Sequence, residues 1–389
     1  MIFEKEANSM RKQVVIYSEA FLPNIGGGEN YCADLARTLT DLGEDVTVIT
    51  PIKSATEDTF NFNLIRMRAP IFIGFNINFL EPFIHIVKER PKVVILSGPA
   101  VSDFAMIPFL SILRIPIVVV FHGQFNKKWA RAFMKVVAPI VYTFSDKIIV
   151  QTIRDLEYLK GLNVPVTKIV FFIFNGVDTE KFKCPPIAER YNLIKGDRSL
   201  RFIFIGGLTS SRPYKGIALL LEIFKKIVSN DISPTPELIV VGGGDLLEPL
   251  RKSTKNFKNI HFLGYLSDDE LIRELCLSDM LILPSKTEGE GLGKVVFEAV
   301  SCGKPVMASK FAGASEMVEK YVAGVIFDPF NTDGAVKVIR FLNSHRELLE
   351  KFSLNAQRMM TEEGLDLLST TKKHIKLYEE TRATVKRIK

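Results

Sequence analysis

Residues 284–305 read PSKTEGEGLGKVVFEAVSCGKP, and this stretch decides the fold of the second half of the chain. An apolar run, Met280–Leu283, leads into it and predicts a buried parallel strand. A glycine-punctuated loop, Glu288–Gly293, follows, and a helix is predicted over Lys294–Ser301. A strand, a glycine loop and a helix N-terminus in this order present backbone N–H groups to an anion, so the stretch predicts an anion-binding turn.

Two carboxylates, Glu290 and Glu298, bracket this predicted turn. Eight residues of helix would separate them by about 12 Å at about 1.5 Å per residue. The paired carboxylates of glycosidases lie about 5 to 10 Å apart and act on one bond, so this pair suits two parts of one long ligand better. Glu298 can accept hydrogen bonds from a diol such as a ribose, and Glu290 can reach a group beyond the phosphates. A solvated Glu290 and a helix-face Glu298 without function remain the alternative.

The same stretch resembles the signature of the family 4 retaining glycosyltransferases, which are nucleotide-sugar enzymes of the GT-B fold. The resemblance rests on Glu290 and Glu298, with seven residues between them, within EGxGLGKVVFEAVSCGKPV. Leu292 departs from the family, which most often has Phe there, but the exchange keeps an apolar side chain. The resemblance extends over nearly the whole chain.

The resemblance implies an α/β protein in which two Rossmann-like domains face a central cleft. A length of 389 residues, 47% of them apolar, is sufficient for two domains. We expect an acceptor-binding domain over residues 1–190 and a nucleotide-sugar-binding domain over residues 191–365. The basic, amphipathic residues 366–389 are expected to form a helix that packs back on the first domain.

In the first half, a strand over Gln13–Tyr17 leads into the glycine run 26–28. This run is not the G-x-G-x-x-G dinucleotide fingerprint, and alone it is a weak signal. The resemblance implies that it borders the donor phosphates and the acceptor. His122 follows the strand Ile117–Phe121, at the end of the strand where open α/β sheets bind ligands. The resemblance implies that His122 lies beside the donor sugar.

In the second half, residues 206–216 read GGLTSSRPYKG. They resemble a family element whose arginine and lysine hold the donor diphosphate. Lys215 matches the lysine, but Gly207 occupies the position of the arginine. We expect Arg212 to replace it, because a guanidinium at a glycine turn suits phosphate oxygens. A flexible basic loop is the alternative.

The resemblance assigns catalytic roles to three residues: His122, Glu290 and Lys215. The donor-binding residues that it implies are Gly27, Gly28, Gly207, Arg212, Lys215, Gly243, Leu266, Gly291, Leu292, Gly293, Lys294 and Glu298.

These residues predict a retaining transfer of sugar from a UDP- or GDP-linked donor to a hydroxyl of a lipid-linked or polysaccharide acceptor. Lys215, Arg212 and the amides near Lys294 would stabilise the departing nucleoside diphosphate, so we expect no metal and no cofactor. Two alternatives stay open. One is an inactive sugar-nucleotide-binding scaffold, suggested by the missing arginine. The other is an NAD-type oxidoreductase, which the absent fingerprint disfavours.

The net charge of +7 is spread along the chain, and no basic run is interleaved with aromatics, so nucleic acid is not expected as a partner. An amphipathic helix predicted over residues 127–143 is basic at its start and holds the one tryptophan of the chain, a pattern typical of membrane-surface helices. A plain surface helix is the alternative. The candidate membrane contacts are Lys127, Lys128, Trp129, Arg131 and Lys135. We expect a cytoplasmic protein, peripheral on the inner face of the cell membrane.

The four cysteines, Cys32, Cys184, Cys276 and Cys302, lie far apart in the sequence. They form no C-x-x-C motif and no cluster with histidine. The spacing therefore predicts neither a disulfide framework nor a zinc site, and it suits a reducing compartment.

Overall fold

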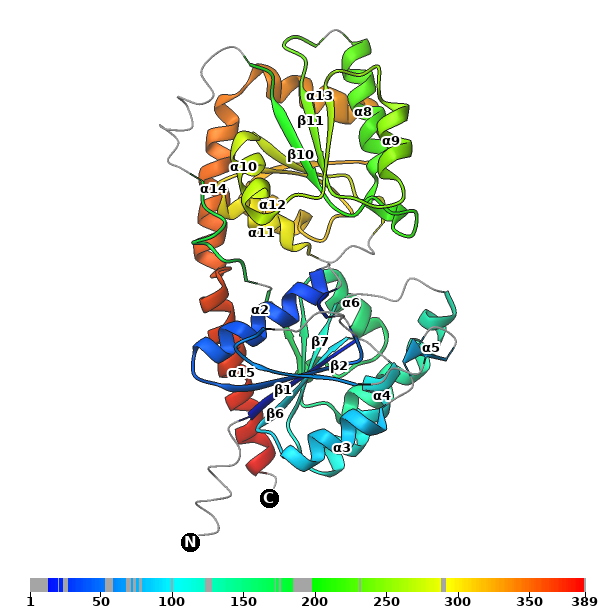
Figure 1. Cartoon of the computed structure of the whole chain (residues 1–389), viewed down its shortest axis with the longest axis vertical. Coiled ribbons are helices and arrows are strands. Elements are labelled where there is room, and N and C mark those ends of the chain that lie inside the picture. Colours follow the sequence, from blue (N-terminus) through cyan, green and yellow to red (C-terminus); the bar gives the residue numbers. More distant parts are fainter. Residues whose placement is uncertain are drawn as a thin grey trace. The chain divides into compact units, whose positions relative to one another are not determined.

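The chain forms two compact units (Figure 1). Unit 1 comprises Met1–Gly176 and Leu367–Lys389, and unit 2 comprises Val177–Asp366. The last helix of the chain is therefore part of the first unit. The computed structural model describes residues 13–19, 21–23, 27–52, 59–67, 71–72, 75–76, 79–98, 101–122, 128–171, 173–174, 176–184, 198–230, 232–287 and 292–387.

Unit 1 is built on a sheet of seven parallel strands in the order β3-β2-β1-β6-β7-β8-β9. The strands are β1 (Gln13–Ser18), β2 (Asp45–Thr50), β3 (Asn63–Arg66), β6 (Val93–Gly98), β7 (Ile117–Phe121), β8 (Lys147–Val150) and β9 (Ile169–Phe171). A short antiparallel pair, β4 (Ile71–Phe72) and β5 (Phe75–Asn76), stands apart from this sheet. The helices are α2 (Gly27–Asp41), α3 (Leu80–Glu89), α4 (Val101–Ile112), α5 (Lys128–Val141), α6 (Ile153–Gly161) and α15 (Leu367–Arg387), with 3-10 turns η1 (Tyr142–Phe144) and η2 (Val166–Lys168).

The sheet of unit 1 is apolar on both faces, because successive residues of a strand point to opposite sides. In β1, Val15 and Tyr17 enter one core together with side chains of α3, α4, α5 and α6. Val14 and Ile16 enter the other core with side chains of α2, and there Leu377 and Tyr378 of α15 complete the packing. Two helical layers thus cover the sheet, as continuous apolar runs in parallel strands require.

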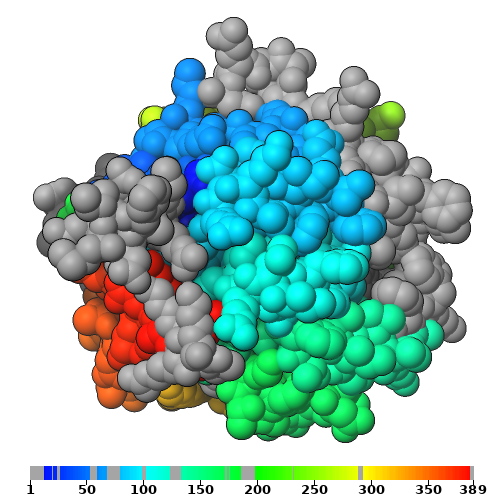
Figure 2. All heavy atoms as spheres, turned by 90° about the horizontal axis from the view of Figure 1, so that it is seen from below, coloured from blue at the N-terminus to red at the C-terminus, as the bar shows by residue number. Residues whose placement is uncertain are grey.

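Unit 1 has a cavity of about 150 Å³ at the amino ends of β6 and β7. Its lining comes from the turns that precede these strands and from the last turns of α15, and it includes Arg90, Arg114 and Arg382. Figure 2 shows this face, with the red end of α15 beside the cyan segments. The cavity lies at the opposite edge of the sheet from His122, and no predicted site residue lines it.

Unit 2 repeats the design with six parallel strands in the order β12-β11-β10-β13-β14-β15. The strands are β10 (Arg201–Ile205), β11 (Glu237–Val241), β12 (Ile260–Gly264), β13 (Met280–Leu283), β14 (Val306–Ser309) and β15 (Gly324–Phe327). The helices are α8 (Ile217–Ser229), α9 (Leu247–Ser253), α10 (Asp268–Leu277), α11 (Lys294–Ser301), α12 (Ser315–Tyr321), α13 (Thr332–Ser344) and α14 (Glu347–Glu363), with the 3-10 turn η3 (Pro213–Lys215).

The first strand of each unit lies inside its sheet, with later strands on both sides. In unit 1 the chain reverses direction across the sheet between β1 and β6, and in unit 2 between β10 and β13. Crevices at such reversals, outside the carboxyl ends of the strands, are where open α/β sheets bind ligands. The strand and the helix predicted around residues 284–305 are confirmed as β13 and α11, with the same bounds.

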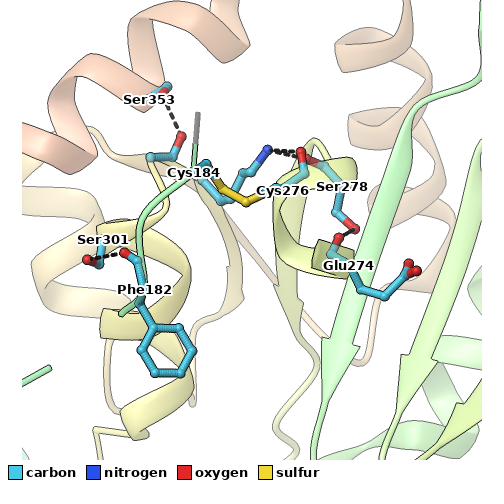
Figure 3. Close-up of a disulfide and its surroundings, with 9 residues drawn as sticks. Phe182, Cys184, Glu274, Cys276, Ser278, Ser301 and Ser353 are labelled. Carbon is cyan, nitrogen blue, oxygen red and sulfur yellow. Dashed lines mark hydrogen bonds between the residues drawn. A yellow bond between two sulfur atoms is a disulfide. The ribbon is translucent and has the colours of Figure 1, made fainter. Parts of the chain in front are cut away.

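The expectation that no disulfide forms is wrong. Cys184 and Cys276 are bonded to each other, with their Cα atoms 5.5 Å apart, although 92 residues separate them in the sequence (Figure 3). The fold of unit 2 brings the segment before residue 185 against the end of α10, which cysteine spacing could not reveal. Cys32 and Cys302 are buried and belong to no disulfide. In the described part of the chain, no helix combines the length and the apolar character needed to cross a bilayer.

Candidate functional site

His122 lies at the carboxyl edge of the unit 1 sheet, immediately after β7. Its backbone N–H donates to the carbonyl of Gly98 over 3.2 Å, which ties it to the end of the neighbouring strand β6. Its Nε2 lies 2.8 Å from Ser97 Oγ. The sheet therefore fixes both the backbone and the ring of this histidine at the end where a ligand is expected.

A buried hydrogen-bond chain leads from Cys32 to this imidazole. Burial raises the pKa of Cys32 to about 11, so the thiol keeps its proton and donates to Ser97 Oγ over 3.1 Å. The same Ser97 hydroxyl is hydrogen-bonded to Nε2 of His122 and so joins the thiol to the ring. Burial also lowers the pKa of His122 to about 4, so the ring is neutral at physiological pH.

Sequence reasoning missed the partners of His122. Besides Ser97 and Cys32, the ring of Tyr31 meets the imidazole edge-on, with centroids 5.0 Å apart and planes at 74°. Ser97 lies one residue before the end of β6, and its position near a strand end could have marked it as a candidate site residue. Tyr31 and Cys32 sit in α2, where they read as ordinary core residues.

The glycine run after β1 is described in part. Gly27 and Gly28 form the first turn of α2, whereas residue 26 lies outside the described residues. A second polar group, also missed, lies at the end of β1. Tyr17 donates to Ser102 Oγ over 3.0 Å, and Ser102 donates to the carboxylate of Glu19. The edge around β1 thus offers one imidazole and one carboxylate.

In unit 2, glycines let the backbones at the ends of β10 and β11 approach closely. A Cβ on Gly242 would lie 2.1 Å from the carbonyl oxygen of Gly206. A Cβ on Gly244 would lie 2.2 Å from that of Leu208. Leu208 also donates to the carbonyl of Gly243 over 2.8 Å. These approaches exclude side chains and shape a tight backbone turn at the carboxyl edge of the sheet.

Two cations fold back over the glycines that follow β10. Lys215 Nζ lies 3.3 Å from the position that a Cβ on Gly206 would take. Arg212 Nη1 lies 4.0 Å from the corresponding position on Gly207. The structure therefore brings Lys215, Arg212 and Gly207 together, as a diphosphate-binding turn requires.

Gly243 and Leu266 come from neighbouring turns at the same edge. Gly243 lies under the ring of Tyr265, so closely that a Cβ on the glycine would be 2.3 Å from Tyr265 Cε2. Tyr265 is 73% exposed, and the following Leu266 is half-buried. The tyrosine presents an aromatic face to solvent beside the turn, a feature absent from the predicted site.

Gly293 is the N-cap of helix α11, and its φ of 74° favours glycine. Among the described residues, no side chain caps the first turn of this helix. Lys294 Nζ lies 4.0 Å from Glu298 Oε1, one turn along the helix. Glu298 is only 9% exposed, and Leu292 before the helix is buried, which explains why an apolar exchange is accepted there. Glu290 and Gly291 lie outside the described residues.

The chain matches two family profiles in sequence. The one described as Glycosyltransferase Family 4 matches residues 25–181, and the one described as Glycosyl transferases group 1 matches residues 192–359. The sulfoquinovosyl transferase of Arabidopsis thaliana is 24% identical over 368 residues, 90% of this chain and 70% of that protein. A GDP-mannose-dependent phosphatidylinositol monomannoside mannosyltransferase of Mycolicibacterium smegmatis is 30% identical over 177 residues, 42% of this chain and 44% of that protein.

Among solved structures, Anabaena HepE in complex with UDP is similar, with a TM-score of 0.76 and 17% identity. The match covers 95% of this chain and all of that one, so the two sheets and their helices form a GT-B fold. The two family profiles, the relatives and the fold all lead to the same conclusion. The chain belongs to the group 1, family 4 glycosyltransferases and is a sugar-transferring enzyme.

Proposed function

We propose that this glycosyltransferase takes its sugar from a nucleoside diphosphate donor, passes it to a hydroxyl group and retains the anomeric configuration. The observation that carries the proposal is the pair of cations, Arg212 and Lys215, folded over the glycine turn after β10. HepE was solved with UDP and with UDP-glucose, which makes a uridine donor the first to test. Retention follows from the family 4 resemblance.

Unit 2 would bind the donor. The diphosphate would lie against Lys215, Arg212 and the first amides of α11, where positive charge and oriented N–H groups favour it. The buried Glu298 would accept hydrogen bonds from the ribose hydroxyls. Glu290 would hold hydroxyls of the donor sugar.

The same groups would stabilise the leaving nucleoside diphosphate as its charge develops. Two fixed cations and a helix N-terminus supply what a divalent metal supplies in other transferases, so we propose a metal-independent reaction. The neutral His122 would contact the donor sugar through a hydrogen bond. No protein nucleophile is assigned.

Unit 1 would bind the acceptor and dock on an anionic membrane surface. Large apolar side chains are exposed on three successive helices, α3, α4 and α5, and the rings of Phe83 and Phe109 link the first two, with centroids 5.9 Å apart. The exposed set is Leu80, Ile84, Phe109, Ile112, Leu113, Val136 and Ile140. Lys135 on α5 is exposed, whereas Lys127 and the side chains of residues 128–131 lie outside the described residues. Apolar side chains beside cations favour a lipid-linked acceptor.

The decisive experiment is donor hydrolysis against UDP- and GDP-linked sugars, combined with thermal shifts in UDP, GDP, ADP and NAD. We expect one nucleoside diphosphate to raise the melting temperature, since a ligand that binds only the folded state stabilises it, and its sugar conjugate to be hydrolysed. Stabilisation by a nucleoside diphosphate without hydrolysis or transfer would contradict catalysis with that donor. Stabilisation by NAD alone would refute the nucleotide-sugar assignment.

A further inference from the structure

We propose that Cys184, Cys276 and Cys302 form a thiol–disulfide exchange centre in unit 2, in which one disulfide moves among three sulfur atoms. The proposal does not depend on glycosyl transfer. It concerns the only group of three or more His, Cys, Asp or Glu side chains, among the described residues, whose ligand atoms are close enough together to hold one metal ion.

The three sulfur atoms all lie within 4.8 Å of one another. Cys184 and Cys276 are half-buried and bonded to each other, and Cys302, with 1% exposure, is a thiol outside this disulfide. The sulfurs come from three separate elements. Cys184 lies in the segment that opens unit 2, Cys276 lies in the last turn of α10, and Cys302 follows the last residue of α11.

Hydrogen bonds hold the backbone around all three cysteines, and Figure 3 draws those that surround the Cys184–Cys276 disulfide. Ser301 Oγ donates to the carbonyl of Phe182 over 2.6 Å, which joins the neighbours of Cys302 and Cys184. Ser353 donates to the carbonyl of Gly303 on the other side of Cys302. The buried Lys304 donates to the carbonyls of Cys276 and Ser278, over 2.8 and 2.6 Å. The sulfurs are therefore kept close by the fold, and not by the disulfide alone.

The exchange step is balanced without any other reagent. The Cys302 thiolate attacks Sγ of Cys276, a Cys276–Cys302 bond forms, and the Cys184–Cys276 bond breaks. The electron pair leaves with Cys184, which takes up the proton that Cys302 lost. Attack on Cys184 releases Cys276 in the same way.

Each pairing fixes a different part of unit 2. The Cys184–Cys276 bond holds the opening segment to α10, whereas a Cys276–Cys302 bond would release that segment and join α10 to α11. A Cys184–Cys302 bond would join the opening segment to α11, the helix that carries Glu298. Exchange would therefore decide which element is cross-linked to the helix of the proposed donor site.

A thiophilic metal ion is the competing use of three sulfurs. Structural zinc sites have four protein ligands, and the group contains three within the described residues. The geometry therefore favours disulfide exchange over metal binding.

The test is to remove one sulfur at a time and map the remaining linkages. The variants Cys184→Ser, Cys276→Ser and Cys302→Ser are incubated in a glutathione redox buffer, quenched with acid, digested without reduction and analysed by mass spectrometry. Here glutathione disulfide is the oxidant and is reduced to glutathione. We expect a Cys276–Cys302 link in the first variant, a Cys184–Cys302 link in the second and a Cys184–Cys276 link in the third.

Each replacement leaves three of the four cysteines. Formation of one disulfide should therefore lower the number of titratable thiols from three to one. The remaining thiol is that of Cys32 in unit 1. Cys32→Ser is the matched control and should keep the Cys184–Cys276 link. Cooperative thermal unfolding shows that each variant is folded. Folded Cys184→Ser and Cys276→Ser proteins that keep three thiols would overturn the proposal. So would a reduced parent protein that binds one cadmium ion through thiolates while these variants form no new link.

Discussion

The guanidinium of Arg212 lies over Gly207, with Nη1 4.0 Å from the position that a Cβ on that glycine would occupy. Chain neighbours aside, no other heavy atom of the described residues lies within 4 Å of that position. The guanidinium at this position therefore comes from five residues later in the loop. The space in which a side chain at residue 207 would begin is unoccupied by other described residues.

Arg212→Ala should lower kcat/KM for the donor by about 10- to 150-fold, which corresponds to the roughly 1.5–3 kcal/mol of a hydrogen bond to a charged group. Steady-state kinetics measure the change. Arg358→Ala, which removes an exposed arginine paired with Glu362, should leave the kinetics unchanged. Adding Gly207→Arg to the Arg212→Ala protein should restore part of the loss, because the position is open. If Arg212→Ala has parental kinetics, the loop is only a basic surface segment.

Glu298→Ala should mainly weaken the binding of the free nucleoside diphosphate, again by about 1.5–3 kcal/mol for lost charged hydrogen bonds. Isothermal titration calorimetry measures this directly. Glu290→Ala should instead mainly lower turnover. Glu319→Ala, in the helix α12, is the control. A Glu298→Ala protein that binds nucleotide as tightly as the parent would show that this carboxylate does not hold the ribose.

Acid should destabilise unit 1 through its two buried histidines. Burial lowers the pKa of His122 to about 4 and that of His374 to about 3, against 6.5 in an unfolded chain. Between pH 6.5 and 4 the unfolded chain binds protons that the folded one does not. The free energy of unfolding then falls, by about 1.4 kcal/mol per pH unit for each histidine.

Urea unfolding between pH 7 and 4.5 measures this loss. His374→Gln should be less stable at pH 7, because the ring bridges the hydroxyls of Tyr31 and Tyr378, but its stability should depend less on pH. Equal pH slopes in the parent and the variant would show that His374 is protonated in the folded protein.

Activity should survive a strong chelator, because the proposed stabilisation of the leaving group uses Lys215, Arg212 and backbone amides. Transfer is measured after dialysis against EDTA, with magnesium or manganese added back in parallel. Full loss in EDTA that either metal restores would refute the metal-independent mechanism.

Binding to liposomes should require anionic lipid and weaken with salt, since each basic residue near an anionic surface contributes about 1 kcal/mol. Co-sedimentation measures it. Lys127, Lys128 and Arg131 changed together to Glu should reduce binding, as should Ile112→Glu and Val136→Glu, whose side chains are 73% and 67% exposed. Leu354→Glu, at an exposed position of unit 2, is the control. Protein that stays in the supernatant under all conditions would favour a soluble acceptor.

Local patterns predicted the elements well, because a strand and a helix are written in consecutive residues. The bounds of β13 and α11 follow from the apolar run and the glycines on either side. The position of His122 at a strand end was equally visible. What surrounds His122 was not, since Ser97, Cys32 and Tyr31 reach it from a different strand and helix, and only the pairing of β6 with β7 and the packing of α2 bring them together.

The cysteines show the same limit more sharply. Spacing rules find cysteine pairs within one turn or loop. Cys184 and Cys276 lie 92 residues apart, one in an irregular segment and the other in the last turn of α10, and only the tertiary fold brings them together. Likewise, the approach of Arg212 to Gly207 depends on how the loop between them folds, which the order of residues alone does not give.

The membership of α15 in unit 1 sets an order of events during synthesis. Leu377 and Tyr378 complete a core whose other side chains come from the first 176 residues, so that core remains open to solvent while all of unit 2 is translated. At about 5–20 residues per second, this wait is on the order of 10–40 seconds. The unit whose synthesis starts first is thus finished last, and a nascent chain needs protection of the α2 face of the sheet until its final helix leaves the ribosome.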